Sequence, residues 1–367
     1  MTSQVKNSQH ERLFYVTKRA SMPMWQSLTV RVLSIVAALL FCGLITFLLV
    51  GKSPFELYET MFEGSFGTSR KIWKLLKELS ILLCIALAVT PAFRMRFWNI
   101  GAEGQVLVGC LSTIACMYYL GGKIPDALLI PIMLAAALCA GALWGVLPAI
   151  FKAKWNTNET LFTLMMNYIA SFLVAYFLLL WTPDGSSTLA RLEHGHLPEL
   201  FGNQYMLIIL VVAFLTALMF MYLNYSKHGY EISVVGESEK TARYVGINVS
   251  KVILRTMLLS GAICGLTGFL ISGGLDHSIT TESAGGRGFT AIMVSWLAKF
   301  NPLLMVVTSF LVVFLQQGAA QMSQDFNMSD AFPNVIVGII LFFIIGCEFF
   351  INYKIVFPSR VAKERKA

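Results

Sequence analysis

The chain has 367 residues, of which 56% are hydrophobic and only 13% are charged, and its mean hydropathy is +0.69. Because soluble globular domains typically carry about 25% charged residues, this composition excludes an ordinary soluble protein and predicts one embedded in a lipid bilayer. The net charge of +8 is spread over many loops and forms no single stripe, so it does not indicate nucleic-acid binding.

Residues 1–29 are polar, mixed in charge and without a cleavable signal pattern, so we expect a cytoplasmic N-terminal segment. Within it, residues 7–28 fit either an amphipathic helix on the membrane surface or a loosely ordered tail. A membrane-spanning helix needs roughly 20 mostly apolar residues, and the transmembrane domain, residues 30–352, contains about ten such stretches by this criterion. These predicted spans are 30–50, 75–93, 103–121, 127–151, 159–182, 206–224, 253–273, 289–300, 302–320 and 333–352.

The fold class that we predict is an all-α membrane protein with both termini cytoplasmic. Cytoplasmic loops retain lysine and arginine, and most of the 28 basic residues fall in cytoplasmic segments when the N-terminus is placed inside. Residues 353–367 then form a cytoplasmic basic tail. Spans 2–5 and 7–10 run in opposite directions, which predicts two inverted halves.

The cysteines, the histidines and the fragments that resemble nucleotide-binding motifs do not indicate a redox, metal or nucleotide site. The seven cysteines fall within predicted spans and form no CxxC pair, so apolar packing is favoured over redox or metal roles. Glu193–His196 in an outer loop fits a metal site or a solvated loop, and because no further ligands gather nearby, no metal is expected. Gly51-Lys52-Ser53 lacks the glycine that a phosphate-binding loop needs five positions earlier. We therefore expect no ATP, Mg²⁺ or other cofactor in this chain.

Two glycine-rich stretches, Trp98–Gln105 and Glu282–Ile292, open the third and eighth spans. They occupy corresponding places in the two inverted halves, and glycine-interrupted segments at such places indicate the substrate path of a transporter. The alternative is that both are glycine-containing turns followed by ordinary helix starts.

Polar side chains near these stretches are candidates for contact with a solute. A carboxylate such as Glu103 is costly within the apolar zone unless it is paired or hydrated, and amides offer both donors and acceptors to a hydroxylated solute. The alternative is hydrogen bonding between helices, which stabilises membrane bundles. The predicted substrate-pathway residues are Asn99, Glu103, Gln105, Asn167 and Phe289.

The loop of residues 225–252 is polar in an otherwise apolar chain. Residues Glu237–Tyr244 favour a helix, Ser238 is a suitable cap for its start, and Gly246 stands where a left-handed C-cap belongs. Such a helix is too short to persist alone in water. We therefore expect it to dock, either on the inner face of this protein or in a groove of a soluble partner.

Four motifs carry a resemblance to a known family: Phe97–Gln105; Glu159 with Asn167–Ala170; Val235–Glu237 with Ala242–Ile247; and Gly288–Ile292 followed by Asn301–Leu303. From about Pro54 to its C-terminus, the chain resembles the permease subunits of bacterial ATP-binding-cassette importers of the branched-chain amino acid and simple-sugar class. It is most similar to the larger permease of purine-nucleoside importers.

The resemblance implies a cytoplasmic coupling helix that contacts an ATPase. Lys240-Thr241-Ala242 followed by Gly246 is loosely similar to the family's Glu-Ala-Ala-x-x-x-Gly, although the glutamate is absent. The residues assigned to coupling are Gly236, Glu237, Thr241, Ala242, Arg243 and Gly246.

The implied partners are a second, smaller permease, two ABC ATPase subunits that bind ATP and Mg²⁺, and an extracytoplasmic substrate-binding protein. The implied location is the bacterial inner membrane. Residues 53–70 and 183–204 are expected to dock the binding protein, and the implied substrate is a nucleoside or a related simple sugar.

Two other classes of protein fit the sequence less well. An ion-coupled secondary transporter should show acidic relays within its spans, and Glu103 is the one strong candidate. A membrane-embedded hydrolase has Ser260-Gly261 as a possible nucleophile, but no histidine lies within a predicted span to activate it.

Overall fold

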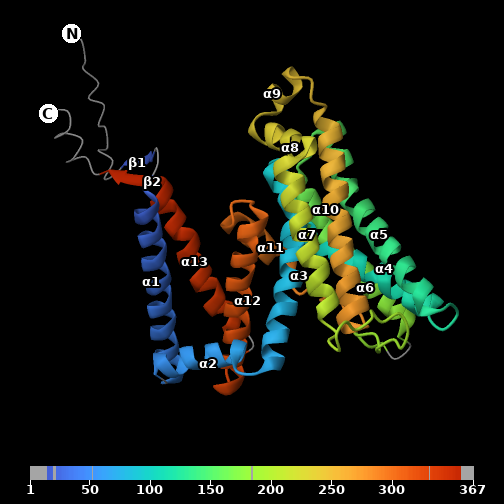
Figure 1. The fold of residues 1–367 in the computed structure, drawn as a ribbon, viewed down its shortest axis with the longest axis horizontal. Coiled ribbons are helices and arrows are strands. Elements are labelled where there is room, and N and C mark those ends of the chain that lie inside the picture. The colour runs from blue at the N-terminus through green and yellow to red at the C-terminus, as the bar shows by residue number, and fades with distance from the viewer. Residues whose placement is uncertain (1–14, 20–21, 52, 183–184, 330, 357–367) are drawn as a thin grey trace, which may run out of the picture. The chain divides into compact units, whose positions relative to one another are not determined.

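A computed structural model describes residues 15–19, 22–51, 53–182, 185–329 and 331–356, and in this part of the chain nearly all regular structure is helical (Figure 1). The helices belong to two compact units. The first unit combines the residues up to Gly64 with those from Leu315 onward, and the second runs from Ser65 to Phe314. The predicted N-terminal segment before residue 15 and the basic tail from residue 357 lie outside the described residues.

The first unit is built on two long apolar helices, α1 (Met24–Val50) and α13 (Phe332–Asn352), which pack side by side (Figure 1). At one end, the strands β1 (Tyr15–Lys18) and β2 (Tyr353–Val356) form an antiparallel pair. Both strands are rich in aromatic and β-branched residues, which favour extended pairing. The structure thus corrects the sequence prediction here: part of residues 7–28 is a strand, not a surface helix or a loose tail, and α1 begins before residue 30.

The helix α2 (Pro54–Phe66) was not expected to span the membrane, and it packs on the second half of α12 (Pro302–Asp325). There the Gln317 side chain donates to the Gly64 carbonyl at 3.0 Å. Gly318 lies against the backbone and side chain of Met61.

The second unit is organised around one buried helix, α10 (Val249–Ile271). Together with the π-helical turn η1 (Ser272–Asp276) it forms a candidate span, and 72% of the residues in the most apolar part of this span are buried. In the other helices long and apolar enough to span a membrane, the same share is between 19% and 39%. Around it and beside it lie α3 (Ser69–Arg94), α4 (Ala102–Leu120), α5 (Asp126–Trp155), α6 (Glu159–Trp181), α7 (Met206–Tyr225), α8 (Lys227–Glu237), α9 (Glu239–Tyr244) and α11 (Arg287–Leu297).

Every predicted span coincides with a helix of the structure, and among the described residues 7 helices are long and apolar enough to cross a membrane. These are α1, α5, α6, α7, α10 with η1, α12 and α13. The helices α3, α4 and α11 do not meet the criterion. For two of them the residues give the reason: α4 begins with Glu103 and Gln105, and α11 has only 11 residues.

Glycines bring α10 into backbone contact with α5. A Cβ on Gly261 would lie 2.3 Å from the carbonyl oxygen of Gly141, and one on Gly265 would lie 2.1 Å from that of Ala137. Membrane helices pack closely through small residues because lipid supplies no hydrophobic force between them. The absence of side chains at these positions therefore determines how near α5 lies to the central helix.

We predict that Gly261→Ala destabilises the protein, because its Cβ would force α5 and α10 apart. The loss should exceed the gain of about 1 kcal/mol that alanine brings to a helix interior. Gly338→Ala on α13 is the matched control, since no heavy atom in the described part of the chain lies within 4 Å of its added Cβ. The measurement is the thermal unfolding midpoint in detergent. An unchanged midpoint for Gly261→Ala would contradict this packing.

Candidate functional site

The first glycine-rich stretch connects α3 to α4, and buried amide side chains hold it in place. Asn99 is 0% exposed, and its Oδ1 accepts a hydrogen bond from the Gly101 N–H at 3.0 Å. The amides of Asn99 and Gln105 exchange hydrogen bonds of 3.3 and 3.4 Å, and Asn99 also donates to the Ser260 hydroxyl of α10 at 3.3 Å. These two predicted pathway residues therefore lie inside this chain and bind each other.

Asn167 of α6 supports the start of α4 from a neighbouring helix. Its Oδ1 accepts from the Gly104 N–H and its Nδ2 donates to the Ile100 carbonyl, both at 2.9 Å. The first four N–H groups of a helix lack intrahelical acceptors, and Asn167 supplies an acceptor for one of them, the Gly104 N–H. The hydrogen bonding between helices that the sequence allowed is what the structure shows for this residue.

Glu103 connects the two glycine-rich stretches directly. Its Oε1 accepts from the Gly286 N–H and its Oε2 from the Gly288 N–H, each at 2.7 Å. Because these groups stand at the N-terminus of α11, the carboxylate lies where a helix dipole favours negative charge. Two segments that the sequence placed at corresponding positions are thus joined by one side chain.

An ion pair that the sequence analysis missed supports the same junction. The Arg287 guanidinium donates to Glu78 of α3 at 2.9 and 3.2 Å, and Nη1 also donates to the carbonyls of Ser283 and Ala284 at 3.4 Å. Lys77 approaches the other oxygen of Glu78 at 2.9 Å. The available signal was a carboxylate inside predicted span 75–93, which is costly unless it is paired.

Phe289 lies apart from the buried amides, on an exposed face of α11. Phe289, Met293 and Trp296 recur at helical spacing and are 44%, 36% and 52% exposed. The Trp296 ring lies 5.5 Å from the ring of Trp98, which is itself 43% exposed. The structure therefore brings Asn99, Glu103, Gln105 and Asn167 together around the start of α4, whereas Phe289 belongs to an open aromatic surface beside it.

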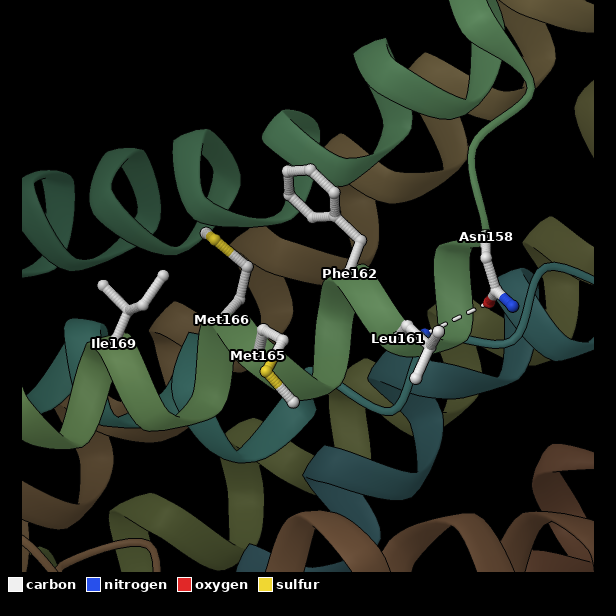
Figure 2. Close-up of a pocket in the computed structure, with 6 residues that line it drawn as sticks. All are labelled: Asn158, Leu161, Phe162, Met165, Met166 and Ile169. Carbon is white, nitrogen blue, oxygen red and sulfur yellow. Dashed lines mark hydrogen bonds between the residues drawn. The ribbon is translucent and has the colours of Figure 1, made fainter.

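A cavity of about 380 Å³ lies along the first half of α6. Figure 2 shows its lining: Asn158, Leu161, Phe162, Met165, Met166 and Ile169. Asn158 is the polar residue among them, and its side chain accepts from the Leu161 N–H at 3.2 Å as the cap of α6 (dashed line in Figure 2). Apolar side chains at such a groove suit lipid or a partner helix better than a hydroxylated solute.

The polar loop forms the short helix that its sequence predicts. Ser238 caps α9 by accepting from the Thr241 N–H at 3.2 Å, and Gly246 has φ +82°. The N–H groups of Gly246 and Ile247 donate to the carbonyls of Arg243 and Ala242 at 3.1 and 2.9 Å, which is the Schellman pattern of a helix end. The loop holds two helices, because α8 ends at Glu237 before α9 begins at Glu239.

The faces of α9 differ in exposure. Ala242 is 0% exposed and docks the helix on its own chain, whereas Tyr244 is 92% and Val245 57% exposed. Thr241, Arg243 and Glu237 are also exposed. Gly236 at the end of α8 is buried so close to α3 that its Cβ would lie 2.1 Å from the Arg94 carbonyl oxygen. Both expected modes of docking are therefore compatible: one face is buried in this chain, and another is open.

The loop that leads from α6 to α7, described from residue 185 to residue 205, lies at the other end of the second unit from α8 and α9 (Figure 1). There the rings of His196 and His277 stack at 3.8 Å, and the Gly195 N–H donates to Asp126 at 3.1 Å. Burial, then the neighbouring His196 and Arg191, lower the pKa of His277 to about 4, so it is neutral near pH 7. Within the described residues no three histidine, cysteine or acidic side chains gather as a metal site.

Comparisons with known proteins identify a family and several relatives. The family described as "Branched-chain amino acid transport system / permease component" matches residues 72–345. A guanosine ABC transporter permease of Bacillus subtilis (NupP) is 28% identical over 83% of this chain and 89% of its own length. A nucleoside ABC transporter permease of Lactococcus lactis (NupB) is 28% identical over 82% and 86%. A glucose ABC transporter permease of Haloferax volcanii (TsgB13) is 26% identical over 92% of each chain.

These relatives are transport components and not enzymes. Membership of such a family implies an ATPase and a substrate-binding partner, and the apolar helices agree with a multi-pass membrane protein. The family match covers most of the chain, from α3 to α13. The chain therefore belongs to the family of permease components of branched-chain amino acid transport systems.

Proposed function

We propose that this chain is the transmembrane permease subunit of an ATP-driven importer and that it forms the translocation path for a nucleoside or a related simple sugar. The observation that carries the proposal is α9: a capped short helix that buries Ala242 and exposes Tyr244, in a chain of a permease family. A large aromatic side chain exposed on a polar loop is a suitable anchor for a soluble partner.

The full importer that we propose contains a second, smaller permease, two ATPase subunits that bind ATP and Mg²⁺, and an extracytoplasmic substrate-binding protein. In this proposal the chain has about ten spans in two inverted halves and lies in the bacterial inner membrane with both termini and α8–α9 cytoplasmic. The distribution of lysine and arginine supports this orientation. The outer loop is then available to the binding protein.

Contacts inside the second unit connect α9 to the translocation path, so a movement of α9 can change the shape of that path. The exposed Tyr244, Arg243 and Glu237 would contact the ATPase, and α9 continues from α8. The tight contact of Gly236 with the Arg94 carbonyl passes movement to the end of α3. The stretch Trp98–Gln105 follows α3, and Glu103 joins it to α11. Such coupling requires a structural element with two states, and the ATPase contact and the substrate path must both shift its equilibrium.

In this proposal, some residues around α4 hold the helix in place and others border the translocation path. Asn99, Gln105 and Asn167 hold the start of α4, and Glu103 and the aromatic face of α11 with Phe289 border the path. The substrates named for the similar proteins are guanosine, nucleosides and glucose. All of these carry a hydroxylated ring, which an aromatic surface beside hydrogen-bonding groups suits.

Reconstitution tests the function against the alternative of an ion-coupled secondary transporter. Vesicles that contain this chain with its ATPase and second permease should take up nucleoside only with ATP inside and binding protein outside. The chain should also retain the ATPase during purification in detergent. Concentration of nucleoside by vesicles that hold this chain alone would favour the ion-coupled alternative.

We predict that Gly246→Pro abolishes uptake and leaves membrane insertion intact. Proline has φ near −65° and no N–H, whereas Gly246 has φ +82° and donates to the Arg243 carbonyl. The strain of about 1–3 kcal/mol should unravel the end of α9. Gly246→Asn is the control because asparagine tolerates the left-handed region. Uptake and membrane content are measured together, and normal uptake by the proline variant would remove the coupling assignment.

We predict that Glu103→Gln lowers uptake because a glutamine has one acceptor oxygen for the two N–H groups of Gly286 and Gly288. An unsatisfied donor costs about 1–3 kcal/mol, which loosens α11 from α4. Glu282→Gln, an exposed residue at the start of the same stretch, is the matched control. The readouts are uptake and recovery of the assembled importer. If Glu103→Gln changes neither, Glu103 has no role in the path.

A further inference from the structure

A polar cavity of about 270 Å³ is lined by the end of α5, the start of α10 and α9. Its wall contains Lys152 and Lys154 of α5, Arg243 and Glu239 of α9, and Ser250 of α10. The cavity is separate from the α4–α11 junction, and of its lining residues only Arg243 is also assigned to contact with the ATPase.

The charges around this cavity favour an anion. Lys152 is held by Glu159 at 2.9 Å, with both side chains at most 20% exposed. Arg243 lies 3.8 Å from Glu239, but this pair is 70% and 52% exposed, and ion pairs so exposed contribute little. Lys154 lies over the ring of Trp155 at 5.8 Å. Three cations thus face one lining carboxylate, and the positive charge near Lys154 and Arg243 is only weakly compensated.

The start of α10 adds donors to the same cavity. Asn248 caps the helix through the Lys251 N–H at 3.1 Å. The N–H groups of Val249 and Ser250 precede the first intrahelical hydrogen bonds, and both residues line the cavity. A 23-residue helix presents positive potential at this end. Backbone N–H groups, a hydroxyl and flexible ammonium and guanidinium groups match the oxygens of a phosphate.

The position of the cavity at the end of α5 indicates the source of the anion. The candidate span Asp126–Trp155 ends at this cavity, and Trp155 is 63% and Phe151 37% exposed. Exposed aromatic residues at the end of a span mark the membrane interface, and basic residues beside them attract anionic headgroups. The cavity therefore opens at the depth of lipid phosphates.

We propose that this cavity binds the phosphate of an anionic membrane lipid and that the bound phosphate joins Lys154 of α5 to Arg243 of α9. A phosphate at this place holds the short helix α9 against a membrane-spanning helix. The binding itself goes beyond the proposed function. Only its consequence, that anionic lipid sets the position of the coupling helix, rests on that function.

The test uses the purified full chain in a neutral detergent, with the thermal unfolding midpoint as readout. Short-chain phosphatidylglycerol should raise the midpoint saturably, and the zwitterionic phosphatidylcholine should not. Inorganic phosphate is a further arm: a shift of equal size with phosphate would assign the site to a soluble anion, and the cavity would keep its phosphate chemistry but lose its lipid source.

Variants of the lining residues test whether the lipid binds at this cavity. Lys154→Gln and Arg243→Gln should each weaken the apparent affinity for phosphatidylglycerol about tenfold, the effect of one charge-assisted hydrogen bond. Lys240→Gln on the same helix is the matched control, since Lys240 is exposed and does not line the cavity. Unliganded midpoints confirm that the variants fold.

Binding that survives both cavity variants, or an equal loss in Lys240→Gln, would overturn the site, and so would the lack of any shift with either anion. Because the readout needs no ATPase, its failure leaves the proposed coupling role of α9 untouched.

Discussion

The arrangement of the second unit depends on one carboxylate shared between two helix starts. Glu103 belongs to the first turn of α4 and accepts the N–H groups at the start of α11, each at 2.7 Å. A carboxylate within a membrane protein is costly unless it is paired or hydrogen-bonded, and here the N–H donors to Glu103 come from Gly286 and Gly288, far along the chain. Asn167 and Asn99 hold α4, and Arg287 with Glu78 holds the start of α11. The junction is therefore supported from both sides.

The same unit presents two different ends. Near α9, hydrogen bonds at Ser238 and Gly246 define a helix of six residues that is too short to be stable alone. Ala242 of α9 is buried and Tyr244 is exposed, and the preceding helix α8 packs tightly on α3 through Gly236. At the other end, stacked histidines and backbone pairing hold the loop between α6 and α7 beside the segment that leads to α11.

Local patterns in the sequence predicted the long helices and α9, but not α8 or the long-range contacts. Apolar length predicted a helix at each of the long stretches, and the serine and glycine of the polar loop predicted α9, because caps act within a few residues. The strand pair of Tyr15–Lys18 with Tyr353–Val356 joins the two ends of the chain, so no local signal announced it. The ion pair of Glu78 with Arg287 and the contact of Gly141 with Gly261 likewise depend on how distant helices meet. For Asn167, both a pathway role and helix support were open, and only the positions of Ile100 and Gly104 showed which hydrogen bonds it makes.

The central claim is that this membrane chain is moved by a separate ATPase through α9. The most direct measurement places a photo-crosslinking phenylalanine analogue at position 244 of the assembled importer in native membranes. The account predicts a crosslink to the ATPase subunit that changes in yield when ATP is bound. A crosslink to the extracytoplasmic binding protein, or no crosslink to the ATPase in an importer that transports normally, would contradict it.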